Sequence, residues 1–316
     1  METKPKHIIL GAGGAIGNVL VNELLCNNEK VKLVGRDPKP INGVEIAKAD
    51  LNFYGELEEV IEDNSIVYLL VGLKYDYEVW KEHWPVIMAN VIDVCISKNA
   101  SLIFFDNVYM YGKVEGKMTE ETPFNPCSKK GRIRADIANM LLAQINNGTI
   151  KAMIARSADF YGPYAEKTSI LSMFVFDKLK NGKKAQWLIN ANLKHSFTYT
   201  NDCGKALYML ATTEEAYGQT WHLPTSSPAL SGEDYIKKAT GIYGVKPDYS
   251  IMKKWMVQLG GLFVTMIKEV NEMLYQNEYD YEFDSSKFEK TFNFKPTSYE
   301  NGIKETIDFY KSTEVR

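Results

Sequence analysis

The sequence predicts an α/β fold, in which a doubly wound parallel sheet is followed by a smaller, mostly helical C-terminal lobe. A glycine-rich turn near the start of the chain joins a short apolar run at 7–10 to a helical pattern at 19–25. Short apolar runs and amphipathic stretches then alternate to about residue 165. Strands that alternate with helices are typical of βαβ units and of a buried parallel sheet.

The glycine-rich turn lies between a strand and a helix, where it would present unpaired helix N-terminal amides to a pyrophosphate. Its spacing is GxxGxxG rather than GxGxxG, so its position gives the motif its weight. We expect a Rossmann-like fold that binds a nicotinamide dinucleotide through Gly11, Gly13, Gly14, Ala15, Ile16 and Gly17.

The remaining elements of the first half follow from the period of the apolar residues. Short apolar runs predict strands at 7–10, 31–34, 44–47, 66–71, 101–105 and 151–155. Helical spacing predicts helices at 56–62, 76–98 and 130–146.

After about residue 165 the alternation ends. Helical patterns at 170–181, 203–215, 231–242, 251–275 and 299–311 surround a short strand at 186–189. We assign 1–165, with part of 190–225, to an NAD(P)-binding domain and about 166–190 and 226–316 to a substrate-binding lobe. The apolar face of 251–275 is expected to be core of that lobe or the wall of a pocket for an uncharged substrate.

Composition excludes several classes of protein. The 316 residues are 45 % hydrophobic with a net charge of −3, which gives no basic footprint for nucleic acid. No apolar run is long enough to span a bilayer, and the N-terminus lacks a signal-peptide core, so we expect a cytoplasmic protein. The four cysteines lack metal-site spacing, so no metal is expected.

The residues after the second strand favour NADP over NAD. An acidic residue at this place binds the ribose 2′-hydroxyl, whereas a basic one accommodates a 2′-phosphate. Gly35 removes the carboxylate, and Arg36 offers a guanidinium to the phosphate. Asp37 keeps NAD as the alternative.

Two further segments are expected at the cofactor. Asp50 and Leu51, after the third strand, are placed to contact the adenine. The segment after the fourth strand adds Val71, Gly72 and Leu73.

Beyond the glycine turn and Asp50-Leu51, the chain carries an ordered series of short motifs. They are Tyr111-Gly112, Tyr161-Gly162-Pro163, the run 195–202, Asp284-Ser285-Ser286-Lys287 and Phe294-Lys295-Pro296. With them the chain resembles, over nearly its whole length, the extended short-chain dehydrogenase/reductase superfamily, in the NAD-dependent epimerase/dehydratase family. The resemblance implies a possible homodimer through the helices near 80–98 and 130–146.

The catalytic positions depart from that family, whose members use a Ser or Thr after the fifth strand and a Tyr-x-x-x-Lys pair on the next helix. Asn107 stands at the Ser/Thr position, and Lys130 and Arg134 stand at the positions of the Tyr and the Lys. Lys130, also expected to contact the cofactor, can serve as an acid if neighbouring cations depress its pKa. Tyr109 or Tyr111 can supply the phenol instead. Alternatively, Lys130 and its basic neighbours are an exposed helix start, and both tyrosines are packing residues.

The residues expected at the substrate also differ from the family pattern. Asp159 stands where related sugar-nucleotide epimerases carry an Asn, and His195 where an arginine is common. An Arg-Pro-Gly-Asp segment expected before Asp284 is replaced by 275–280. A carboxylate facing a diphosphate costs binding energy. The expected pocket residues are Tyr75, Trp80, Tyr111, Asp159, Tyr161 and His195.

Three hypotheses follow. The first is an NADP-preferring oxidoreductase that acts on a small, largely apolar carbonyl or enone. The second is a nucleotide-sugar epimerase or dehydratase with a rearranged site. The third is a non-catalytic protein that senses NADP through a partner. The departures at the substrate positions favour the first.

Overall fold

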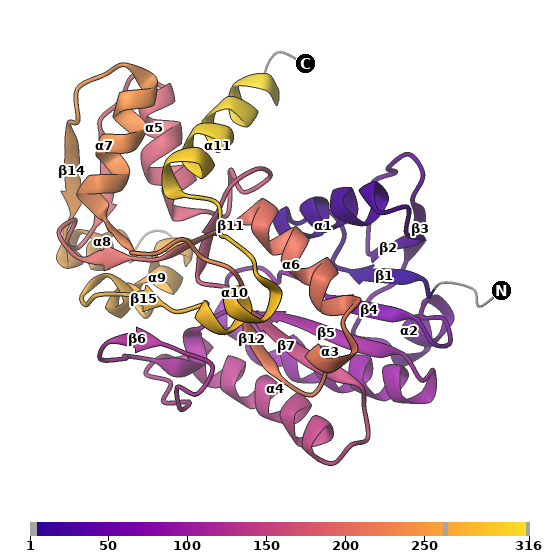
Figure 1. Cartoon of the computed structure of the whole chain (residues 1–316). Helices are drawn as coiled ribbons and strands as arrows, with labels where there is room; N and C mark the ends of the chain where they lie inside the picture. Colours follow the sequence, from indigo (N-terminus) through magenta and orange to yellow (C-terminus); the bar gives the residue numbers. More distant parts are fainter. Residues whose placement is uncertain (1–4, 262–264, 314–316) are drawn as a thin grey trace.

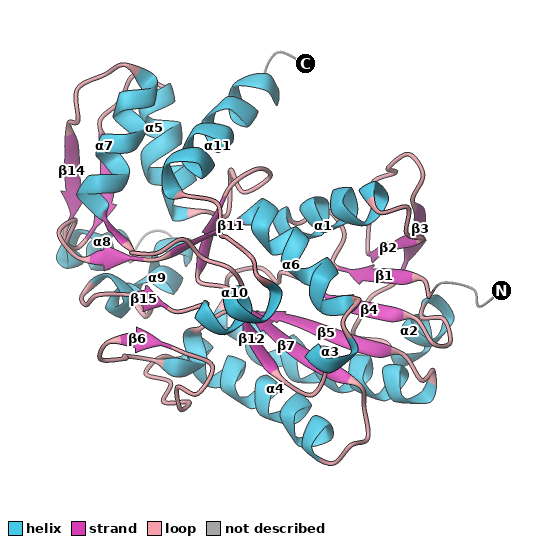
Figure 2. Ribbon diagram, in the orientation of Figure 1, coloured by secondary structure: helices cyan, strands magenta, loops and turns pink. Residues whose placement is uncertain are grey.

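The central sheet of the computed structural model has seven parallel strands (Figures 1 and 2). The structure describes residues 5–261 and 265–313, without the side chains of 265–267. From one edge to the other the strands are β3 (Glu45–Lys48), β2 (Val31–Gly35), β1 (His7–Leu10), β4 (Ile66–Leu69), β5 (Ser101–Asp106), β7 (Ala152–Arg156) and β12 (Thr220–His222).

The order in which successive strands join the sheet reverses at β1. His7 pairs with Val31 of β2 on one side and with Ile66 of β4 on the other. The first half of the sheet therefore grows away from β1 in one direction and the second half in the other. In open parallel sheets this switch point opens a crevice at the carboxyl ends of the strands, where ligands bind.

Helices cover both faces of the sheet because successive strand residues point to opposite sides. Ile8 and Leu10 pack on one face, and Ile9 packs on the other. The first face is covered by α2 (Tyr54–Val60), α3 (Tyr77–Ser97) and α4 (Lys129–Asn146). The opposite face is covered by α1 (Ala15–Cys26) and α6 (Thr200–Ala211). The predicted doubly wound α/β fold is confirmed.

A C-terminal lobe lies beside the sheet in Figure 1. It contains a π-helical turn (Ser172–Phe176), α5 (Asp177–Lys180), α7 (Gly232–Tyr243), α8 (Lys254–Gly260), α9 (Thr265–Asn271) and α11 (Tyr299–Thr313), with β9 (Ala185–Leu188) parallel to β14 (Tyr249–Met252). Its aromatic core includes Trp187 stacked on Tyr235, with ring centroids 6.1 Å apart.

Short strand pairs connect the lobe to the sheet. These are β8 (Asp159–Tyr161) with β11 (Phe197–Tyr199), β10 (Lys194–His195) with β13 (Leu230–Ser231), and β6 (Lys117–Met118) with β15 (Glu282–Phe283). The remaining elements are α10 (Ser286–Phe292) and the 3₁₀ turns Tyr109–Tyr111, Glu214–Ala216 and Leu274–Asn277.

The single helix expected over 251–275 is wrong. The chain instead runs through the end of β14, then α8, α9 and a 3₁₀ turn. Trp255, Met256 and Leu259 of the expected apolar face are 61 %, 46 % and 52 % exposed, whereas Met273 and Leu274 are buried. Leu262 and Phe263, and the side chains of Met266 and Ile267, lie outside the described residues. Two glycines at 260 and 261 divide the pattern.

Within the ranges 5–261 and 265–313, no helix has the length and apolar character needed to cross a membrane.

The contact between α1 and α6 depends on Gly204. A Cβ there would lie 2.9 Å from the Val19 carbonyl oxygen, so the two helices would have to separate. We predict that Gly204→Ala lowers the free energy of unfolding by about 1–3 kcal/mol. The matched helical control, Gly241→Ala, meets nothing within 4 Å and should raise it by about 0.5–1 kcal/mol. Urea unfolding measures both, and equal effects of the two changes would contradict this assignment.

Candidate functional site

The glycine turn closes tightly against the fourth strand. Gly11 has φ 110°, and its N–H donates to the Val34 carbonyl at 3.0 Å. A Cβ on Gly11 would lie 2.6 Å from Val71 Cα. Both the backbone conformation and the close approach to Val71 therefore require glycine at this position.

The start of α1 is open toward the crevice side of the turn. Gly14 is the N-cap, no side chain caps the helix, and its first turn carries no acidic residue. A Cβ on Gly13 would meet nothing within 4 Å. The first turn of α1 therefore has no side-chain cap and begins next to the open space at Gly13, which fits a pyrophosphate.

The end of β2 carries the residues expected to read the ribose. Arg36 and Asp37 are exposed, and Asp37 lies 4.0 Å from Lys48. The Asn52 amide and, to a smaller extent, the Arg36 guanidinium hold the pKa of Asp50 below its usual range. Arg36 and Asp50 therefore interact electrostatically at one end of the candidate cofactor site.

The rest of the predicted cofactor set lines the same edge. Leu51 is buried, and its carbonyl accepts a hydrogen bond from Asn90 at 3.1 Å. After β4, Val71 and Leu73 are half-buried and Gly72 is exposed. This segment follows β4 at the switch point and so borders the crevice.

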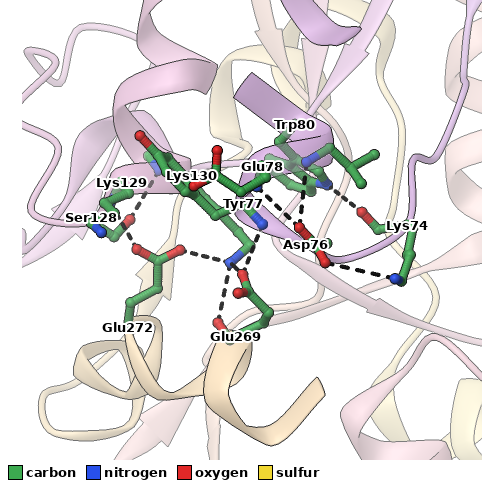
Figure 3. Close-up of polar contacts among 12 residues, drawn as sticks. Lys74, Asp76, Tyr77, Glu78, Trp80, Ser128, Lys129, Lys130, Glu269 and Glu272 are labelled. Carbon is green, nitrogen blue, oxygen red and sulfur yellow. Dashed lines mark hydrogen bonds and ion pairs between the residues drawn. The ribbon is translucent and has the colours of Figure 1, made fainter. Parts of the chain in front are cut away.

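Lys130 is fully buried at the start of α4 and is enclosed by carboxylates (Figure 3). Its Nζ donates to Glu269 Oε2, to Glu272 Oε1 at 2.7 Å and to the Glu269 carbonyl at 3.3 Å. An ammonium has three N–H donors, and all three are used here. The alternative of an exposed helix start is wrong for Lys130, although Lys129 and Arg132 beside it are exposed.

The same two glutamates bind the first turns of two helices (Figure 3). Glu269 Oε2 accepts from the Tyr77 N–H of α3 at 2.9 Å, and Glu272 Oε2 accepts from the Lys129 N–H of α4 at 2.8 Å. Carboxylates at helix N-termini are favourable because those amides have no partner within the helix. The contacts join the C-terminal lobe to the sheet domain.

Arg134 is buried and paired rather than directed at open space. Its Nε donates to Asp106 Oδ1 at 2.8 Å, and its guanidinium lies 4.5 Å from the Trp84 ring centroid. Arg156 approaches the other oxygen of Asp106 from the next strand at 3.3 Å. One carboxylate at the end of β5 is therefore shared by two buried guanidinium groups.

Aromatic side chains line the space beside Asn107. The Asn107 side chain accepts a hydrogen bond from the Tyr109 N–H at 3.0 Å, which shapes the turn after β5. The Tyr109 ring stacks on Trp80 with ring centroids 6.4 Å apart, and Tyr75 lies edge-on to Trp80. Burial, with a contribution from Asp159, raises the pKa of Tyr109, so its phenol stays protonated at neutral pH.

Asp159 and His195, the two substrate-side departures, form a pair. His195 Nε2 lies 2.9 Å from Asp159 Oδ2, and the His195 ring stacks on Tyr281 at 4.3 Å. The Asp159 carboxylate raises the pKa of Tyr75, Tyr109 and Tyr281 in addition to the larger effect of burial. These phenols and the pair therefore share one region.

Tyr111 and Tyr161 lie deeper than the other predicted pocket residues. The Tyr111 hydroxyl accepts from Arg156 at 2.9 Å and donates to His222 Nε2 at 2.8 Å. Burial lowers the pKa of His222 to about 3, which keeps the ring neutral and able to accept. Tyr161 is fully buried in the lobe core. Both phenols are enclosed by protein in this structure.

Sequence reasoning missed Glu269, Glu272 and Tyr281. Glu269 and Glu272 lie 139 and 142 positions from Lys130. No local motif marks any of the three. A buried lysine needs a carboxylate partner, so the requirement for one was foreseeable, but its identity was not.

The sheet order, the switch point and the glycine turn define a Rossmann-type α/β fold. The sequence of residues 7–223 matches the model of the NAD dependent epimerase/dehydratase family. The chain belongs to this family.

Solved structures support the fold over the whole chain. A dTDP-glucose 4,6-dehydratase from Bacillus anthracis, in complex with NAD, has a TM-score of 0.80 at 15 % identity, covering 99 % of this chain and 98 % of that one. A UDP-glucuronic acid 4-epimerase from Bacillus cereus, in complex with UDP-glucuronic acid and NAD, has 0.78 at 18 %, covering 98 % and 99 %. A Thermus thermophilus UDP-glucose 4-epimerase, also with NAD, has 0.77 at 15 %, covering 97 % and 99 %.

The two buried arginines make Asp106 hard to replace. We predict that Asp106→Asn lowers the free energy of unfolding by about 3–5 kcal/mol, because Arg134 and Arg156 would lose their shared charge partner. The control is Asp63→Asn, whose side chain is 76 % exposed and lies 3.9 Å from Lys98; its effect should stay below about 1 kcal/mol. Thermal or urea unfolding compares them, and a small effect at Asp106 would refute the assigned role.

Proposed function

We propose that this protein uses a nicotinamide dinucleotide to oxidise or reduce a hydroxyl or carbonyl carbon of a sugar-type substrate, with nucleotide sugars as the first class to test. The observation that carries the proposal is the Gly11–Val71 contact beside the uncapped start of α1, which fits a pyrophosphate. The similar structures named above are nucleotide-sugar dehydratases and epimerases that cover both parts of the chain. Nucleotide sugars thus rank before a small apolar carbonyl or enone, whereas the sequence alone favoured the carbonyl or enone.

The dinucleotide would be held along the sheet edge, and when bound it supplies the hydride acceptor or donor. The amides of Ala15, Ile16 and Gly17 suit the pyrophosphate, and Asp50 the adenosine end. We place the dinucleotide on 1–165 with part of 190–225, and the substrate against 166–190 and 226–316.

The groups that can handle the substrate proton differ from those of the family pattern. Lys130 has all three N–H donors committed, and Arg134 stays protonated and paired. Tyr109 keeps its proton and can donate a hydrogen bond to a substrate oxygen. The Asp159–His195 pair adds a carboxylate and an imidazole, which can hydrogen-bond to a substrate hydroxyl.

Of the two nicotinamide dinucleotides, NADP is the proposed cofactor. Arg36 is exposed at the end of β2 and follows a glycine, so a 2′-phosphate meets a cation and no carboxylate at that position. The relatives named above were solved with NAD, which supports a nicotinamide dinucleotide in general.

A small, largely apolar carbonyl or enone is the second candidate substrate. Asp159, Glu269 and Glu272 place three carboxylates near the aromatic wall of Tyr75 and Tyr109. The Lys130 ammonium beside them is already paired with Glu269 and Glu272. A diphosphate would be repelled there, whereas an uncharged carbonyl would not.

Fluorescence titration with NADPH and NADH tests the proposed function first. We predict saturable binding that Gly11→Ala abolishes, because its Cβ would displace the turn. With the dinucleotide bound, UDP-glucose and dTDP-glucose should give turnover, and an enone and aldehyde panel tests the second candidate. Binding without turnover of any class would point to the sensing protein, and absence of dinucleotide binding would refute the proposal.

Arg36→Ala tests the cofactor preference. We predict that wild type binds NADPH about 100-fold more tightly than NADH, roughly 2.7 kcal/mol, and that the variant loses this difference. Lys39→Ala, an exposed cation three residues away, is the matched control and should keep it. Equal affinity of wild type for both nucleotides would refute the preference, and tighter binding of NADH would assign the site to NAD.

A further inference from the structure

Resting on the proposed function, we propose that Glu269 and Glu272 form a clasp that closes the C-terminal lobe over Lys130 and opens to admit the nicotinamide end of the dinucleotide. The clasp is defined as Lys130, Glu269, Glu272 and the N–H groups of Tyr77 and Lys129. It lies at the position where the family resemblance puts the group that faces the nicotinamide.

The clasp contacts span the two parts of the molecule (Figure 3). Both glutamates come from the C-terminal lobe, in α9 and just after it, whereas every donor belongs to the sheet domain. Glu269 accepts from the Lys130 ammonium and the Tyr77 N–H with the same oxygen, Oε2. Glu272 accepts from Lys130 with Oε1 and from the Lys129 N–H with Oε2. Tyr75 adds its ring 4.7 Å from the same ammonium. While these contacts last, no part of Lys130 is accessible.

The carboxylates themselves remain reachable by water. The Glu269 and Glu272 side chains are 13 % and 23 % exposed, whereas that of Lys130 is not exposed at all. Water can therefore replace the contacts one at a time, which keeps the cost of opening below that of breaking a fully buried ion pair.

The helix that precedes the clasp glutamates, α8, is weakly packed. In α8, Val257 is buried, while Trp255, Met256 and Leu259 are largely exposed. The local core cluster of Leu188, Val257 and Leu274 also takes in Val270 of α9 and four further half-buried side chains. Elements with few buried apolar contacts open at low free energy, so the polar clasp acts together with Val270 and Leu274 to hold the described part of this segment.

Opening would change the charge that an incoming ligand meets. With the clasp closed, two carboxylates face one ammonium, an unfavourable place for the negatively charged dinucleotide. With the clasp open, the ammonium and the amides of Tyr77 and Lys129 are freed together. The clasp therefore delays the nicotinamide half of the ligand and leaves the adenine half, near Arg36 and Asp50, unaffected.

The test is stopped-flow NADH binding to the full-length Glu269→Gln/Glu272→Gln double variant, with hydrogen exchange on the same samples. We expect the NADH association rate to rise at least 5-fold and the Tyr77 and Lys129 amides to lose protection. ADP-ribose, which lacks the nicotinamide, should bind with a rate within 2-fold of wild type. Glu278→Gln, which breaks the Lys254–Glu278 pair of the same lobe, is the matched control and should change neither rate.

Wild-type protein gives an independent readout. Ligands normally increase amide protection where they bind, but a clasp that opens requires NADH to decrease protection at Tyr77 and Lys129. Increased or unchanged protection, with equal NADH rates in wild type and double variant, would overturn the clasp and leave the proposed function standing. If the double variant does not fold, the single variant Glu272→Gln carries the same expectations for the NADH rate and for the Lys129 amide. Failure of every variant to bind NADH or ADP-ribose would refute the proposed function, and the clasp with it.

Discussion

The carboxylate of Asp106 is the interaction on which the geometry of the site depends. It lies at the end of β5 and holds Arg134 of α4 and Arg156 of β7 while accepting the Asn107 N–H. These contacts set the position of the first turns of α4, and with it the position of Lys130. A single buried charge thus orients the strand ends, the helix and the turn that border the crevice.

The sequence was sufficient for the fold because its signals are local. Each predicted strand of the sheet is a short apolar run, and the glycine turn marks its own geometry. Six strands and the three helices predicted at 56–62, 76–98 and 130–146 therefore lie within a few residues of their predicted places. The fourth strand ends at 69 rather than 71, and the helix predicted at 203–215 begins at 200. The seventh strand, β12, escaped prediction because three residues are too few to show a period.

The candidate site was predictable only in part, because its partners are distant in sequence. The motif positions of Asn107, Lys130 and Arg134 located the region, and the departures at Asp159 and His195 were visible one by one. That these two residues pair, and that Glu269 and Glu272 neutralise Lys130, follows from how the C-terminal lobe returns to the sheet. The substitutions are therefore compensated by contacts that no short motif contains.

The covering of the sheet's second face by α6 limits how this chain can be divided. The helix lies at 200–211, well after the last strand of the first βαβ series, and it packs with α1 over Ile9 and Leu33. A fragment that stops at residue 165 would lack both this helix and the edge strand β12. It would leave a large apolar surface and an unpaired edge exposed, the combination that drives self-association into aggregates. The first 165 residues therefore cannot be treated as an independent folding unit. Expressed or recombined without the rest of the chain, they should aggregate.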